Sequence, residues 1–205
     1  DLFRDLCTVT FMTSFTRMVR GSRSLVVGAA LCGGVARGQD IHIDIQSYDV
    51  AVGQDWTQAS AAAPVQASGN AYRFSASVRP TLDMWVNSLT VKSPAGASYT
   101  LAKGDGDAYE YTEAMALATA FTAKYALGAY NYSFDTSNDG QRTVVLSLSG
   151  GSYPAAPQVS NWTEAQSVDP DQDFDLRWNA FAGAGPNDAI RLVVKDADGS
   201  EVLDT

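Results

Sequence analysis

Histidine and cysteine are nearly absent from this chain, which holds one histidine (His42) and two cysteines (Cys7 and Cys32) among 205 residues. A zinc site built on several His or Cys ligands is therefore excluded. His42 lies within an alternating apolar pattern, which disfavours a Ser-His-Asp triad. The sequence also lacks a phosphate-binding glycine loop followed by Lys-Ser or Lys-Thr, and it lacks a Gly-x-Gly-x-x-Gly motif. We predict that the chain is not an enzyme.

Basic residues are also few, since 14 Lys and Arg stand against 23 Asp and Glu for a formal net charge of −9. Affinity for phosphate depends on clustered Lys and Arg, so neither nucleic acid nor anionic lipid is an expected partner. No apolar segment is close in length to a membrane-spanning helix, which needs about 20 consecutive apolar residues. The composition, 45% hydrophobic and 18% charged, is typical of a globular protein with one large domain or two small ones.

A secretory signal is indicated by the stretch MVRGSRSLVVGAALCGGVARGQD near the start of the chain. Arg20 and Arg23 form a basic lead, residues 25–31 form a short apolar run, and Ala36 and Gly38 supply small residues where a signal peptidase reads them. We predict cleavage near Gly38. The alternative is a buried strand or helix at the start of a cytosolic domain.

Cleavage near Gly38 changes the expected chemistry of the mature chain. It removes both cysteines, five of the 14 basic residues and two of the 23 acidic residues, so nine basic and 21 acidic residues remain and the net charge is −12. Without Cys the mature chain has no disulfide and no thiolate site, so a core must stabilise it. A lipoprotein signal is less favoured because Leu31, not a small residue, precedes Cys32. Residues 1–17 precede the signal and are left out of the expected fold.

Hydrophobic alternation predicts β-strands through most of the remaining chain. Within 40–52, Ile41, Ile43 and Ile45 alternate with polar residues, which is the period of a half-buried strand. The alternation in 71–80 (Tyr72, Phe74, Ala76, Val78) ends at Pro80, and 86–104 holds two short strands about the turn Pro94-Ala95-Gly96.

A hairpin is predicted over 129–150. Asn138-Asp139-Gly140 supplies turn residues that tolerate positive φ. The first strand places three aromatic residues on one face, and three apolar residues anchor the second: Tyr130, Tyr132 and Phe134, then Val145, Leu146 and Leu148.

One segment, TEAMALATAFTAKYALG (112–128), predicts a helix instead of a strand. It is rich in Ala, Met and Leu, and its apolar residues recur every three to four positions. Thr112 is the expected N-cap and Gly128 the expected stop. We expect a helix of about three turns, near 112–126, that covers one end of a sheet.

A boundary is expected at 150–162, where Gly, Ser and Pro cluster. A second set of strands is predicted after it, at 158–162, 174–178, 189–196 and 200–205, with Asp198-Gly199 as the last turn. Four short strands are too few for a sandwich, so we expect a truncated module and a chain that continues past Thr205. The expected domains are a leader and signal peptide (1–38), a β-sandwich (39–152) and this incomplete module (153–205).

Four aspartates at every second position stand out in VDPDQDFDLRW: Asp169, Asp171, Asp173 and Asp175. A helix-loop-helix calcium loop starting there would need Gly and Glu where Phe174 and Ala180 stand, so that motif is absent. Because Phe174, Leu176 and Trp178 alternate with polar residues, we interpret this stretch as a strand with a buried apolar face and solvated aspartates.

KGDGDAYE (103–110) is the better calcium candidate. Asp105, Asp107 and Glu110 lie within six residues on a glycine-rich turn, although calcium takes six to eight oxygen ligands and this stretch supplies about four. An ordinary acidic turn is the favoured interpretation, and these residues are the weak candidates for metal binding. Among the acids, no spacing singles out a pair for glycoside hydrolysis.

Four tryptophans could stack on sugars. Trp162 and Trp178 are expected in the core because they end apolar strands, whereas Trp56 and Trp85 are left open as candidate sugar platforms.

Residues 128–205 carry a resemblance to a known class of module. The stretch PQVSNWTEAQSVDPDQDFDLRWNAFAGAGPNDAIRLVVKDADGSEVLDT, with its early aromatic strand, Val-Asp-Pro turn, strand ending in Trp and Asp-Gly hairpin, resembles immunoglobulin-like or fibronectin-III-like modules of large exported bacterial proteins. GAYNYSFDTSNDGQRTVVLSL is similar to the units that precede such modules. The resemblance implies a β-sandwich in an extracellular setting and carries no catalytic residues.

We therefore expect an all-β protein, in which a β-sandwich with one short covering helix is followed by the truncated Ig-like module. The expected function is a non-enzymatic binding, adhesion or spacer region of a secreted or cell-surface bacterial protein, whose partner is an extracellular protein or a polysaccharide. The alternative is a carbohydrate-binding accessory module of a secreted polysaccharide-degrading enzyme. A hydrolase in its own right ranks third.

Overall fold

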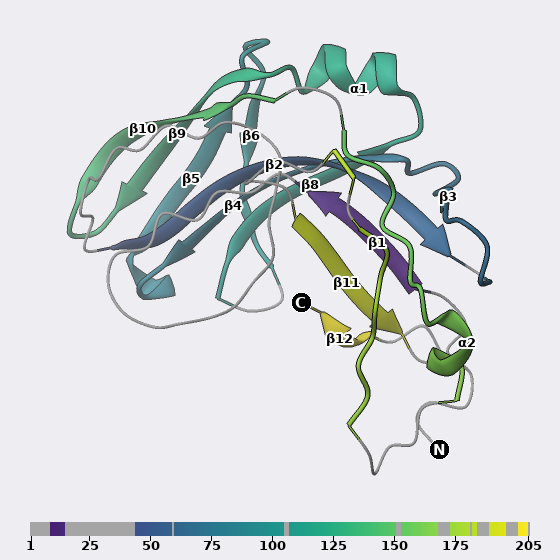
Figure 1. Ribbon diagram of the computed structural model, residues 1–205. Helices are drawn as coiled ribbons and strands as arrows, with labels where there is room; N and C mark the ends of the chain where they lie inside the picture. Colours follow the sequence, from purple (N-terminus) through teal and green to yellow (C-terminus); the bar gives the residue numbers. More distant parts are fainter. Residues whose placement is uncertain are drawn as a thin grey trace.

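The computed structural model describes residues 9–14, 44–58, 60–104, 107–150, 153–167, 173–180, 182–183, 189–195 and 201–204. Most regular elements in these ranges are β-strands, and the strands pair antiparallel in two sheets. The smaller sheet lies over part of the larger one, with α1 at one end of the stack (Figure 1). This arrangement confirms the predicted all-β sandwich with a short covering helix.

The larger sheet has the strand order β12-β11-β1-β2-β4-β8-β7, with β3 paired to β2. Its strands are β1 (Val9–Ser14), β2 (Ile45–Gln58), β3 (Val65–Gln66), β4 (Tyr72–Pro80), β7 (Ala102–Lys103), β8 (Tyr109–Met115), β11 (Ala189–Lys195) and β12 (Glu201–Asp204). The smaller sheet has the order β10-β9-β5-β6. Its strands are β5 (Val86–Lys92), β6 (Ser98–Thr100), β9 (Gly128–Thr136) and β10 (Gly140–Leu148), and a 3-10 turn, η1 (Asp83–Trp85), precedes β5.

The core lies between the two sheets, where the predicted alternation places it. In β4, Phe74, Ala76 and Val78 are fully buried, and Phe74 and Ala76 pair with Val52 and Val50 of β2. Full burial of a large apolar side chain contributes roughly 1.5–3 kcal/mol. The facing side chains of the smaller sheet include Leu89, Val91, Tyr130, Tyr132 and Phe134.

The predicted hairpin forms as β9 and β10, paired without interruption from Gly140↔Thr136 to Leu148↔Gly128. Gly140 has φ 66°, as its place in the turn requires. Leu146 and Leu148 are buried as expected, but Val145 is 52% exposed, so its predicted core position is wrong. Side chains alternate between the faces of a strand, and Val145 therefore points away from the face that its two neighbours share.

The predicted helix exists but is shorter than expected. The helix α1 spans Ala118–Lys124, and Leu117 precedes it with no side-chain cap. Thr112 is not an N-cap, because it lies within β8 and pairs with Ser75 of β4. The backbone of β4 offers β8 a ladder of hydrogen bonds, and this tertiary pairing outweighs the local helix preference of 112–115. Gly128 begins β9 at φ 135°.

The predicted boundary region packs against the larger sheet. The ring of Tyr153 lies 6.2 Å from that of Tyr72, and the prolines at 154 and 157 are buried. The predicted strands 158–162 and 174–178 are wrong, because these segments form only the isolated bridge Val159↔Trp178. Trp162 begins the one-turn helix α2 (Trp162–Ala165).

Side-chain amides replace a regular ladder in this region. The Gln58 amide nitrogen donates to the Val159 carbonyl at 3.2 Å, and the Val159 amide donates to the Gln58 side-chain oxygen at 2.8 Å. Asn161 accepts a bond from the Arg177 amide and donates to the Asp175 carbonyl, both at 2.8 Å. The segment after the sandwich is therefore tied to the end of β2.

At the ends of the chain, β1 pairs with both β2 and β11, an arrangement that the sequence interpretation did not anticipate. The strands predicted near 189–196 and 200–205 are present as β11 and β12, which pair antiparallel. The predicted signal peptide, His42 and the Asp198-Gly199 turn lie outside the described residues, and the division into domains stays a prediction. Of the helices that the structure describes, none is long and apolar enough to cross a membrane.

Candidate functional site

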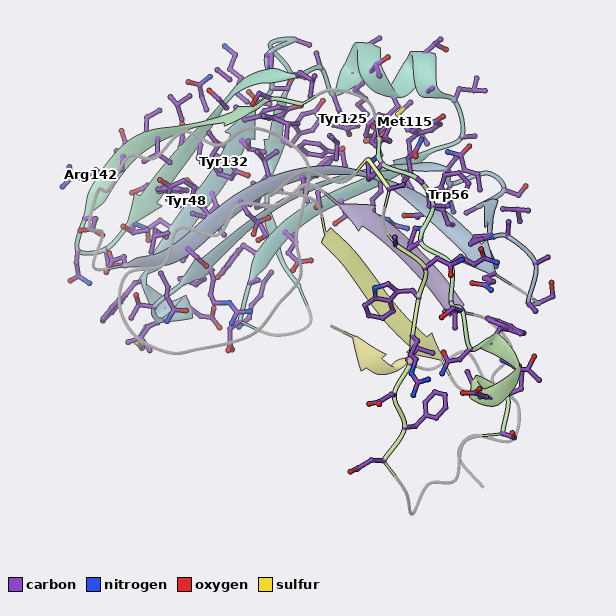
Figure 2. The ribbon with its side chains drawn as sticks, in the orientation of Figure 1. Tyr48, Trp56, Met115, Tyr125, Tyr132 and Arg142 are labelled. Atoms are coloured by element: carbon purple, nitrogen blue, oxygen red, sulfur yellow. The ribbon has the colours of Figure 1, made fainter. Side chains whose placement is uncertain are left out.

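A half-buried cluster of charged and aromatic side chains lies where β8, β6 and α1 meet. We name it the tyrosine–glutamate cluster: Tyr99, Tyr111, Glu113, Lys124 and Tyr125. Glu113 shares the inner face of β8 with Tyr111, because their positions differ by two. Figure 2 shows Tyr125 beneath α1.

Glu113 is the centre of this cluster. Lys124 Nζ lies 2.7 Å from its Oε1 and 2.6 Å from its Oε2. The hydroxyls of Tyr111 and Tyr125 donate to Oε2 at 2.5 and 2.6 Å, and the two hydroxyls lie 3.2 Å apart. One carboxylate thus joins a strand of the larger sheet to the covering helix.

The hydrogen bonds hold Glu113 ionised. The bond from Lys124, followed by those from the two tyrosines, lowers the pKa of Glu113 to about 2. Its carboxylate in turn raises the pKa of Lys124. Burial, helped by the bond to Glu113, raises the pKa of both Tyr111 and Tyr125. A carboxylate this acidic is a poor general acid or base near neutral pH.

Aromatic stacking surrounds the same carboxylate. The rings of Tyr99 and Tyr111 stack at 4.6 Å, and those of Phe74 and Tyr125 stack at 4.1 Å. Lys124 Nζ lies 5.4 Å from the Tyr125 ring centroid, within the range of a cation–π contact. The Tyr99 hydroxyl is buried without a hydrogen-bond partner in the described part of the chain.

A second carboxyl group, that of Asp49 on β2, has a raised pKa, whereas the pKa of Glu113 is lowered. Its Oδ2 accepts a 2.6 Å bond from the Ser77 hydroxyl on β4. Burial, with repulsion from Glu110, raises the pKa of Asp49 to about 7, although Ser77 and Arg79 act to lower it. Asp49, Ser77 and Glu110 lie opposite one another across β2, β4 and β8, so they share the outer face of the larger sheet.

A third carboxylate, Asp44, joins the two sheets at the start of β2. It is fully buried and accepts bonds from the Asn138 amide and side chain, both at 2.7 Å, and from the Asp139 amide at 3.1 Å. Burial alone would raise the pKa of Asp44, but these bonds outweigh it and lower that pKa. The β9–β10 turn is therefore clamped to the start of β2.

The calcium candidates are only partly described. Asp107 and Glu110 are exposed, and Glu110 lies beside Gly104 and near Asp49, while Asp105 lies outside the described residues. Within the described ranges, no group of three or more His, Cys, Asp or Glu side chains is placed to hold a metal ion. The calcium hypothesis stays a prediction.

The aspartate run is also partly described. Asp173 and Asp175 are exposed as expected, and Asp169 and Asp171 lie outside the described residues. The apolar residues between them are not buried as predicted, because Phe174 is 36% and Trp178 43% exposed. Among the described residues this segment pairs only through the Val159↔Trp178 bridge, and alternation alone does not bury one face.

The tryptophans divide differently from the prediction. Trp162 is buried, as expected for a core residue, whereas the core position expected for Trp178 is wrong. Trp56 and Trp85 are half-buried, and the indole N–H of Trp56 is buried without a partner in the described part of the chain.

Sequence reasoning missed the Glu113 and Asp49 arrangements. The predicted helix over 112–126 placed Glu113 and Lys124 on one continuous helix. Eleven residues separate them, so on such a helix their side chains would lie about three turns apart and would not touch. The alternation Tyr109, Tyr111, Glu113, Met115 was the available signal for a strand. Comparison with known proteins found no matching family model, no similar curated protein and no similar solved structure.

Proposed function

We propose that this chain is a non-enzymatic binding or spacer region of a secreted or cell-surface protein. The observation that carries the proposal is that charged side chains bond separate elements of the fold to one another. Glu113 bonds to Lys124 and two tyrosines, and Asp44 bonds to the β9–β10 turn. Asp55 pairs with Arg73 at 2.6 Å. Such ties stiffen a scaffold that presents its surface to a partner.

The secreted location is supported by the signal-like stretch before Gln39. The excess of acidic residues supports a partner other than nucleic acid.

Turnover measurements test the non-enzymatic part of the proposal. The full chain is incubated with a panel of chromogenic glycosides and esters, alongside Glu113→Gln and Asp49→Asn variants. We expect no turnover above that of the buffer. Hydrolysis by the wild type that either substitution abolishes would show that these carboxyls are catalytic and would contradict the proposal.

Export is tested separately. The open reading frame from Met18 is expressed in a bacterial host, and the N-terminus of the exported protein is read by mass spectrometry. We expect a chain that begins at Gln39. Retention of the uncleaved chain in the cytoplasm would contradict a secreted location.

A specific observation favours a second candidate, a carbohydrate-binding accessory module. Phe174 and Trp178 are both exposed on one irregular segment, and exposed aromatic rings can stack on sugar faces. The neighbouring Asp173, Asp175 and Arg177 are exposed and could bond to hydroxyls.

A glycan array with Trp178→Ala tests this candidate. Binding by the wild type that drops by about tenfold or more in the variant would support it, and Trp85→Ala shows whether the half-buried tryptophan contributes. Val65→Ala, at another exposed apolar position (66% exposed), is the control. Absence of glycan binding by the wild type rejects the candidate.

A further inference from the structure

The strand β10 is an end strand of the smaller sheet. It pairs with β9 through nine consecutive residue pairs with no bulge. Within the part of the chain that the structure describes, no strand pairs with its other side. An end strand presents a row of backbone N–H and C=O groups that can template pairing with another chain.

Natural proteins protect such edges with short strands, prolines, bulges or charges. The sequence of β10, GQRTVVLSL, contains no proline and no acid, and Arg142 is its one charged residue. Thr143–Leu148 is an uncharged run of high β-propensity. The other end strands that the structure describes are shorter: β6 has three residues, β7 two and β12 four.

The outer face of β10 is exposed, and the strand is preorganised. Val145 is 52% exposed, and Thr143 and Ser147 on the same face are exposed too. Figure 2 shows Arg142 at the outer margin of β10, pointing away from the sandwich. Because Asp44 clamps the turn that precedes β10, little conformational freedom would be lost on pairing.

The residue pattern of β10 fits pairing with a second copy of the same strand. The chain carries a net charge of −9, so two copies repel each other over most of their surface. The acid-free β10 is an edge where two copies can meet without opposing carboxylates. Antiparallel pairing centred on Val145 would place Val144 opposite Leu146 and Thr143 opposite Ser147. Arg142 would face Leu148 and not its own copy.

We propose that two copies of this chain pair antiparallel through their β10 edges, so that one sheet continues across both. The pairing is self-complementary about a two-fold axis, as an isologous interface requires. Main-chain hydrogen bonds supply the attraction, and contact between the two Val145 side chains sets the register. This inference is independent of the proposed function.

Sedimentation velocity of the full chain from about 1 µM to about 1 mM tests the proposal. We expect a concentration-dependent doubling of mass. Val145→Lys brings two ammonium groups together on the axis and should weaken the dimer by about tenfold or more. The matched control is Val65→Lys, at an apolar position that is 66% exposed on the short strand β3, and it should leave the dimer unchanged.

Far-UV circular dichroism shows that each variant is folded, and Thr143→Lys is a second variant on the same face of β10. Hydrogen exchange should show β10 amides that become protected in the wild type as concentration rises, but not in the lysine variants. The proposal is overturned by a wild type that stays monomeric at every concentration, by assemblies larger than a dimer, or by a dimer that survives Val145→Lys.

Discussion

At the scale of single residues, Glu113 and Asp49 show how partners set the state of a carboxyl group. Both lie on strands of the larger sheet, Asp49 on β2 and Glu113 on β8, and both are half-buried. Glu113 faces Lys124 and two tyrosine hydroxyls, whereas Asp49 has one serine hydroxyl and lies near another acid. The first is held ionised and the second is held partly protonated near neutral pH.

Asp49→Asn, which mimics the protonated carboxyl, should stabilise the protein at high pH. The folded pKa of about 7 lies above the ordinary value of 3.8. The wild type is thus most stable with respect to this group below pH 3.8, and that stability is lost as the pH rises through 7. We expect equal stability at pH 4 and a gain of about 2 kcal/mol at pH 8, measured by urea unfolding.

The control is Asp107→Asn, at an exposed aspartate, which should change stability little at either pH. A difference between Asp49→Asn and wild type that is the same at pH 4 and pH 8 would show that burial does not raise the pKa of Asp49.

Glu113→Gln should have the opposite pH dependence. The pKa of Glu113 falls from 4.5 to about 2 on folding, so its contribution is present above pH 4.5 and is lost as the pH falls through 2. We expect a loss of about 1–2 kcal/mol at pH 7, since solvent screens this partly exposed pair, and no loss near pH 2. Urea unfolding at the two pH values measures it.

Glu164→Gln, at an exposed glutamate of α2, is the matched control for Glu113→Gln. Equal losses at pH 7 and pH 2 would mean that the amide disturbs packing and that the charge contributes nothing.

At the scale of elements, segments without a regular ladder depend on single side chains. Gln58 is buried, with 1% exposure, and bonds to both the amide and the carbonyl of Val159. This side chain holds the irregular segment after the sandwich in place, where prolines prevent regular strand pairing.

Gln58→Ala should therefore release this segment locally. The buried Val159 amide loses its partner, which costs about 1–3 kcal/mol. We expect hydrogen exchange at residues 158–161 to accelerate by about tenfold or more, with β4 and β9 unchanged. Gln141→Ala, an exposed amide on β10, is the control. Uniform acceleration across both sheets would contradict a local role.

At the scale of the whole molecule, the two sheets are joined by the aromatic core and by a few polar ties between them. The Tyr48 ring of the larger sheet lies 5.8 Å from that of Tyr132, whose hydroxyl donates to the Asp49 carbonyl. Both rings lie between the sheets in Figure 2. Asp44 adds the clamp on the β9–β10 turn.

Asp44→Ala should weaken the joining of the sheets. It removes three hydrogen bonds and leaves the Asn138 and Asp139 amides without this partner. We expect the melting temperature to fall by about 5 °C. The control is Asp135→Ala, which replaces an aspartate of β9. An unchanged melting temperature would show that the clamp contributes no net stability.

Local patterns in the sequence were enough to predict much of the fold. Alternating residues predicted β4 and the buried face of β9, and Asn138-Asp139-Gly140 predicted the turn. Strand periodicity and turn chemistry act over a few neighbouring residues, so they can be read without knowing what packs against them. The acidic balance and the scarcity of histidine and cysteine are likewise properties of composition.

Only the tertiary structure decided the rest. Residues 112–115 form a strand because β4 lies beside them, and Trp178 is exposed on a segment that, within the described ranges, pairs only through one bridge. The contact of Glu113 with Lys124 and the raised pKa of Asp49 arise from residues distant in sequence. Burial and charge pairing depend on which strands become neighbours, and that choice is made by the whole chain as it packs.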